Sequence, residues 1–209
     1  MDYNEKQLQI MESAEILFSE KGFEGTSVRD IADAANVNLA MISYYFGSKE
    51  KLLEAIFNLR TKNFTTQLEN MLQDATTPSI EKIYTLVDYY IDKFLQQTCF
   101  HRIMVREQLL SPKGHMGEMI LKMKQNNADL IRQLIKAGQR KGEFIKNIDT
   151  PLMMSTLLGT INHVLSSQHY YRETEHLQEL TPDQFSKHIR KKLSLHLKSL
   201  FKLTLTHEA

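Results

Sequence analysis

Residues 26–29 carry side chains of the types that bind phosphate groups. Thr26 and Ser27 offer hydroxyls directly before an apolar-periodic segment, and Arg29 adds a cation two residues later. A helix that begins here leaves free backbone N–H groups at its N-terminus, which favour an anion such as a nucleic-acid phosphate. Each residue also has a structural interpretation, because Thr or Ser caps helices and Arg29 suits a solvated surface. Capping and phosphate binding are compatible for the hydroxyls, whereas the two interpretations of Arg29 stay open.

Sequence signatures of catalysis are absent from the chain. It contains no G-x-S-x-G, Walker, H-E-x-x-H or G-x-G-x-x-G motif. The eight His are scattered and Cys99 is the single cysteine, so no metal-ligand spacing appears and no internal disulfide can form. We therefore expect no catalytic residue, no metal and no cofactor, with Cys99 as a small buried side chain in a reducing compartment.

Helical periodicity runs through the whole chain. Only four Pro and eight Gly interrupt 209 residues, of which 42% are apolar, and no segment predicts a strand. Cap and turn residues divide the chain: Gly22 ends the first helix, Thr26 or Ser27 caps the second, and residues 36–38 form a turn. The sequence predicts an all-α fold with about nine or ten helices. They are expected at about 5–21, 28–35, 39–46, 49–74, 79–97, 100–110, 115–141, 151–168 and 182–203.

The first three helices have the spacing of a helix-turn-helix, although many structural bundles share that spacing. The residues themselves are more specific. Four segments carry the resemblance: LFSEKGF at 17–23, TSVRDIA at 26–32, ANVN at 35–38 and ISYYFGSKEKLL at 42–53. Together they resemble the N-terminal domain of TetR/AcrR-family (tetracycline-repressor-like) transcriptional regulators over about the first sixty residues. Farther along, only Gly142-Glu143-Phe144 before an apolar helix is similar.

The resemblance implies that residues 1–50 form a DNA-binding domain in which residues 39–46 are the recognition helix. Its exposed candidates offer apolar contact to thymine methyls, and Asn38 either pairs with adenine or caps the helix. Because this helix has no Arg or Lys, we expect half-sites rich in A·T. The resemblance assigns phosphate contacts to Tyr44 and Lys49, and leaves open the role of Tyr45, where the family most often has histidine. The expected DNA-binding residues are Thr26, Ser27, Arg29, Asn38, Leu39, Ala40, Met41, Ser43, Tyr44, Tyr45 and Lys49.

The resemblance also implies a ligand-binding and dimerisation domain in residues 51–209. The apolar stripes of the last two long helices are the expected dimer faces, with plain core packing as the alternative: Leu157, Ile161, Val164, Phe185, Ile189, Leu193 and Leu197. Adaptable methionines and two polar residues in an apolar helix are the candidate lining of a pocket for an apolar small molecule, again with core packing as the alternative. These are Met104, Met119, Met123, Asn162 and His163.

We therefore expect a ligand-responsive repressor that binds a palindromic operator as a homodimer and is released by a small molecule. The N-terminus does not resemble a signal peptide and no apolar run is long enough to span a bilayer, so a cytoplasmic protein without membrane contact is expected. Residues 1–60 contain six Lys/Arg against ten Asp/Glu, a net charge of −4. This acidity limits non-specific affinity for DNA and leaves one alternative: a TetR-like protein-interaction adaptor without operator binding.

Overall fold

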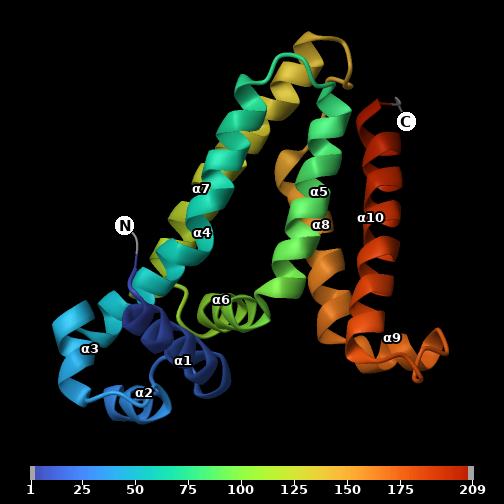
Figure 1. Ribbon diagram of the computed structural model, residues 1–209. Coiled ribbons are helices and arrows are strands. Elements are labelled where there is room, and N and C mark those ends of the chain that lie inside the picture. The colour runs from blue at the N-terminus through green and yellow to red at the C-terminus, as the bar shows by residue number, and fades with distance from the viewer. Residues whose placement is uncertain (1–2, 207–209) are drawn as a thin grey trace. The chain divides into compact units, whose positions relative to one another are not determined.

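The computed structural model describes residues 3–206, and within that range helices are the only regular secondary structure (Figure 1). The predicted all-α fold is confirmed. The sequence did not signal α9, which is a single short helix between two longer ones. In chain order the helices are α1 (Glu5–Lys21), α2 (Val28–Ala34), α3 (Leu39–Phe46), α4 (Lys49–Gln73), α5 (Ser79–Gln96), α6 (Thr98–Leu110), α7 (His115–Arg140), α8 (Thr150–Ser166), α9 (Gln168–Thr174) and α10 (Pro182–Thr206).

Local signals determine where the first three helices begin and end. Ser27 is the N-cap of α2 and forms a capping box with Asp30, so of the two candidates Ser27 rather than Thr26 caps this helix. Asn36 adopts φ 47° in the turn before α3, and the Asn38 side chain accepts a hydrogen bond from the backbone N–H of Ala40. Gly22 ends α1 with φ 81° and ψ 169°, a conformation that requires glycine.

The helices form two compact units. Unit 1 consists of Met1–Thr66 and Thr98–Lys124, and unit 2 consists of Gln67–Gln97 and Gln125–Ala209. The helices α4 and α7 each contribute residues to both units. The compact units therefore do not follow a single division of the chain near residue 50, because α6 and the start of α7 belong with the N-terminal helices.

Unit 1 is built on one hydrophobic core beneath α2 and α3. Phe18 of α1, Ile31 of α2 and Ile42 of α3 are fully or almost fully buried in it, together with Ile56 of α4 and Ile103 of α6. Burial of this many large side chains gives the short helices α2 and α3 the support that their own length does not provide. The core thus fixes the face that α3 turns outward.

In unit 2, α10 lies along α5 (Figure 1), and polar pairs tie the two helices together. Arg190 donates two hydrogen bonds to the Asp92 carboxylate, at 2.6 and 2.8 Å. One turn earlier on α5, Asp88 accepts from Ser194 at 2.6 Å and from Lys198. Because residue numbers rise along α5 as their partners fall along α10, the two helices are antiparallel.

The Gly142-Glu143-Phe144 segment forms the turn after α7. Gly142 has φ 73°, and the Phe144 ring is buried so close to Gly138 that a Cβ there would lie 2.4 Å from it. The Glu143 carboxylate accepts a hydrogen bond from the backbone N–H of Ser79 at 2.5 Å, which links this turn to the start of α5. Among residues 3–206, no helix is long and apolar enough to cross a membrane.

Candidate nucleic-acid interface

The outward face of α3 exposes both apolar and polar side chains. Ile42 and Phe46 anchor α3 in the core of unit 1. Leu39 and Tyr44 of the same helix are among the exposed large hydrophobic residues of the chain. The expected contact residues Asn38, Ala40 and Ser43 are exposed on the same helix, whereas Met41 and Tyr45 are half-buried.

Tyr44 is 82% exposed, which is unusual for an aromatic side chain without a partner molecule. Its ring packs edge-on against Tyr45 with centroids 5.1 Å apart, and Tyr45 packs in turn against Phe46 at 6.4 Å. Three rings in contact therefore connect the exposed Tyr44 to the buried Phe46, which anchors α3. This arrangement gives Tyr45 a supporting role and holds the Tyr44 hydroxyl in solvent.

The hydroxyls of Thr26 and Ser27 differ in accessibility. Thr26 is only 1% exposed, and its Oγ1 donates to the carbonyl oxygen of Gly22 at 2.8 Å. The prediction that the Thr26 hydroxyl contacts a phosphate is therefore wrong, because the side chain is used inside unit 1. Ser27 is exposed, and its Oγ donates to the Asp30 carboxylate at 2.7 Å.

The capping box also places a negative charge at the start of α2. The Asp30 carboxylate accepts from both the Ser27 hydroxyl and the Ser27 backbone N–H, at 2.7 and 2.9 Å. The hydroxyl hydrogen bond lowers the pKa of Asp30, so this carboxylate stays ionised. Arg29, next to it, is exposed and has no hydrogen bond or ion pair with any residue from 3 to 206. Of the charged groups at this helix start, Arg29 is the one available to a phosphate.

Lys49, the first residue of α4, has intramolecular partners. Its Nζ donates to the carbonyl oxygens of Phe23 at 2.8 Å and of Thr26 at 3.0 Å. The same ammonium lies 4.2 Å from the centroid of the Phe23 ring. The Asn38 side-chain oxygen is likewise engaged, as the cap of α3.

Comparison with known proteins identifies the arrangement. The sequence model of bacterial regulatory proteins of the tetR family matches residues 10–56, and a tetracyclin repressor-like C-terminal domain model matches residues 76–166. The HTH-type transcriptional repressor NicS of Pseudomonas putida is 31% identical over 165 residues, which cover 76% of this chain and 77% of NicS. The chain belongs to the tetR family.

Two further comparisons agree with this family over nearly the whole chain. The probable HTH-type transcriptional regulator YttP of Bacillus subtilis is 26% identical over 200 residues, 93% of each protein. The structure of a SmeT–triclosan complex superimposes with a TM-score of 0.75 at 15% identity, over 99% of this chain and 94% of that one, which shows the shared fold. This tetR-family chain is thus a helix-turn-helix transcriptional regulator and not an enzyme. Among the described residues, no group of three or more His, Cys, Asp or Glu is arranged to hold a metal ion.

Most of the residues expected at the dimer interface of this tetR-family chain are buried within one protomer. Six of the seven expected residues have this burial, so they do not form an exposed face for a partner. Val164 is half-buried. The apolar stripe of α10 faces α5, and that of α8 also packs on α5, so core packing accounts for both. The buried six are Leu157, Ile161, Phe185, Ile189, Leu193 and Leu197.

The residues expected to line one ligand pocket are not brought together. Met104, Met119 and Met123 pack in or against the core of unit 1. Asn162 and His163 lie on α8 in unit 2 and are exposed.

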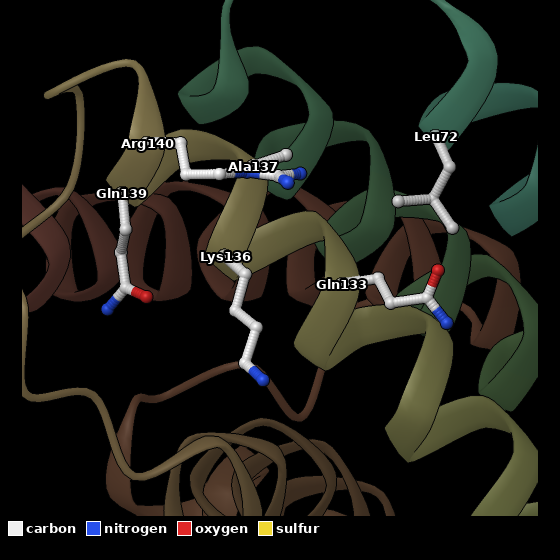
Figure 2. Close-up of a pocket in the computed structure, with 6 residues that line it drawn as sticks. All are labelled: Leu72, Gln133, Lys136, Ala137, Gln139 and Arg140. Carbon is white, nitrogen blue, oxygen red and sulfur yellow. The ribbon is translucent and has the colours of Figure 1, made fainter.

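The structure instead contains a cavity of about 640 Å³ in unit 2, lined by the end of α4 and the last turns of α7 (Figure 2). Four of its six lining residues have polar side chains. Figure 2 shows Lys136 and Gln139 projecting from the same side of α7. Gln139 donates to the carbonyl oxygens of Ile145 and Lys146. The sequence contained a weak signal for this site in polar residues at helical spacing on the side of α7 opposite its apolar face. The lining residues are Leu72, Gln133, Lys136, Ala137, Gln139 and Arg140.

Proposed function

We propose that this tetR-family regulator binds a palindromic DNA operator as a homodimer and represses transcription until a small molecule releases it. The observation that carries the proposal is the outward face of α3, where exposed side chains stand on a helix whose other face is fixed by Ile42 and Phe46. A short rigid helix with an exposed polar and apolar face fits the major groove.

The contact chemistry of α3 favours A·T base pairs. Leu39 and Ala40 are exposed and match the methyl group of thymine, and Ser43 donates or accepts a hydrogen bond at a base edge. The helix carries no Arg or Lys, the residues that most often contact guanine. Tyr44 and Arg29 are exposed, and we assign them to DNA phosphates that flank these base contacts.

Dimerisation is part of the proposal because two recognition helices must reach successive major grooves, about 34 Å apart or a multiple of that distance. Since six of the seven predicted interface residues are buried, we assign the interface to the outer faces of α8 and α10. Leu152 on α8 and Leu195 and Leu203 on α10 are more than half exposed. Gly159 on α8 is exposed and has nothing within 4 Å of its missing Cβ, which allows close approach of a second helix.

The dimer proposal is tested by replacing Leu195 and Leu203 together with lysine and measuring the molar mass by light scattering. The expected result is a monomer that keeps its helical circular dichroism. Leu121→Lys is the matched control, because Leu121 is also exposed but lies on α7 in unit 1. A dimer that survives the double substitution, or one that the control disrupts equally, would overturn the assigned faces.

The effector is proposed to bind in the cavity beside the ends of α4 and α7. Lys136 and Arg140 line it without a hydrogen bond or ion pair to any described residue, and no carboxylate lines it. An anionic small molecule with a short apolar part therefore fits better than the purely apolar ligand that the methionines favoured. Both helices continue into unit 1. A ligand that binds more tightly to one arrangement of α4 and α7 therefore changes the fraction of protein molecules that can bind the operator.

Operator binding is tested by selecting random duplex DNA with the purified protein, followed by a salt titration on the enriched sequence. A palindrome rich in A·T with a steep salt dependence supports the proposal. No enrichment from folded, dimeric protein would instead favour an adaptor that binds other proteins, an alternative that the net charge of −4 over residues 1–60 supports.

A further inference from the structure

The two halves of α3 are held in different ways. In its second half, Ile42 and Phe46 are buried in the core of unit 1. In its first half, Leu39 and Ala40 are exposed, and Asn38 caps the helix. The half of α3 that begins with the proposed base contacts therefore depends on the turn before it for its position.

The turn over residues 36–38 is held by a side chain of α1. Ala35, the residue before the turn, is the C-cap of α2 and is only 1% exposed. Its carbonyl oxygen accepts a hydrogen bond from Nε2 of Gln9 at 2.9 Å. Within the turn, Asn36 adopts φ 47°, and the backbone N–H of Val37 donates to the Ala32 carbonyl at 3.0 Å. Because the last carbonyls of a helix have no partner within that helix, Gln9 supplies a donor that α2 itself does not provide.

A second side chain fixes the orientation of the Gln9 amide. The Nζ of Lys6 donates to Oε1 of Gln9 at 3.0 Å. A glutamine amide has one acceptor side and one donor side, and both are used here. The reverse orientation would place the amide oxygen against the Ala35 carbonyl oxygen and the amide NH₂ against an ammonium. Only one orientation satisfies both neighbours, so Gln9 is held ready to donate to the end of α2.

We propose that Gln9, oriented by Lys6, is a positioning residue for base recognition, which holds the 36–38 turn and through it the first half of α3. Without this donor, the buried Ala35 carbonyl loses its partner and the turn is free to move. A smaller fraction of molecules then holds α3 in the position that reads bases, and operator affinity falls with that fraction. The inference rests on the operator binding proposed above.

Binding to DNA of unrelated sequence distinguishes this role from a direct DNA contact. Non-specific binding depends on the phosphates, which every duplex carries, and not on the base-reading end of α3. Loss of a positioning residue should therefore reduce the ratio of operator affinity to non-specific affinity. A residue that only stabilises the fold should lower the free energy of unfolding and leave this ratio unchanged.

The test compares Gln9→Met, which keeps a side chain of similar length without a donor, with the unchanged protein. Affinity is measured for the selected operator and for a shuffled duplex of the same length, together with hydrogen exchange of the Val37 amide. Operator affinity should fall by roughly two- to twelvefold, while affinity for the shuffled duplex changes little. The Val37 amide should exchange faster. Gln67→Met is the matched control, because Gln67 is an exposed glutamine on α4, and it should leave both affinities unchanged.

An unchanged affinity ratio for Gln9→Met would overturn the proposal, and so would an equal fall in both affinities. If Gln9→Met does not fold, Lys6→Met replaces it, because this variant keeps the glutamine and removes the group that orients its amide. The ratio should fall in the same direction by a smaller factor, and an unchanged ratio would again overturn the proposal. If the unchanged protein binds no operator, the proposed function fails, and exchange of the Val37 amide alone decides whether Gln9 holds the turn.

Discussion

Gly22 joins α1 to the turn over residues 23–26, and its replacement by alanine is expected to destabilise unit 1. Its backbone, with φ 81° and ψ 169°, lies in a region that is essentially restricted to glycine. An added Cβ would also lie 2.6 Å from Cζ of Arg106 on α6. The substitution therefore meets two obstacles, one in the backbone and one in the packing of a side chain.

The backbone obstacle is the larger of the two. Holding a non-glycine residue in this region costs about 1–3 kcal/mol. The atoms of Arg106 near the site are the end of a long flexible side chain, which can move away at the loss of one hydrogen bond to the Glu20 carbonyl, 3.4 Å long and exposed. Such a bond contributes at most about 1 kcal/mol. The free energy of unfolding should fall by about 1–4 kcal/mol, mostly through backbone strain.

Because the chain has no Trp, unfolding in urea is best followed by far-UV circular dichroism. Gly142→Ala is the matched control, since Gly142 has φ 73° and nothing within 4 Å of the added Cβ, so it reports strain without crowding. Its expected cost is about 1–2 kcal/mol. A loss below about 0.5 kcal/mol for Gly22→Ala would refute the strain argument. If adding Arg106→Ala to Gly22→Ala recovers most of the lost free energy of unfolding, crowding by the Arg106 side chain dominates instead.

Three further predictions concern other parts of the chain. Tyr44→Phe should weaken operator binding by roughly two- to twelvefold in a fluorescence titration, with an unchanged salt slope because the hydroxyl is neutral, and should leave the free energy of unfolding unaltered. Ser27→Ala removes the capping box of α2 and should cost about 0.5–2 kcal/mol in urea unfolding; a cost near zero would contradict the assigned cap. Hydrogen bonds from the hydroxyls of Thr77 and Thr76 lower the pKa of Asp74, so its contribution to stability is present above the unfolded carboxyl pKa and is lost as pH falls toward the lower folded value. Asp74→Asn should therefore lose less stability than the unchanged protein between about pH 6 and about pH 3, and an equal loss would count against this linkage.

The local structure of the helix-turn-helix could be predicted because its determinants are short-range. Ser27 and Asp30 are three residues apart, and Asn38 caps the helix that follows it, so backbone and side chain meet within one turn. Gly22 and Asn36 adopt positive φ where the sequence predicted the end of a helix and a turn. The exposed residues of α3 were expected from the family resemblance, and the structure buries Ile42 and Phe46 on this helix.

Partners distant in sequence were decided only by the tertiary structure. The stripe of Phe185 and Leu193 was correctly recognised as apolar, but periodicity is the same whether such a stripe faces a helix of its own chain or a second protomer, and here α5 covers it. The charge of Lys49 was likewise visible, while its acceptors lie 23 and 26 residues earlier and come within reach only when α1, α2 and α4 pack on one core. The sequence by itself thus determined all the helices except α9, the caps of α2 and α3, and the family, because these depend on neighbours along the chain. Which side chains remain available to DNA, to a second protomer or to a ligand depended on burial, which is settled only when the helices pack.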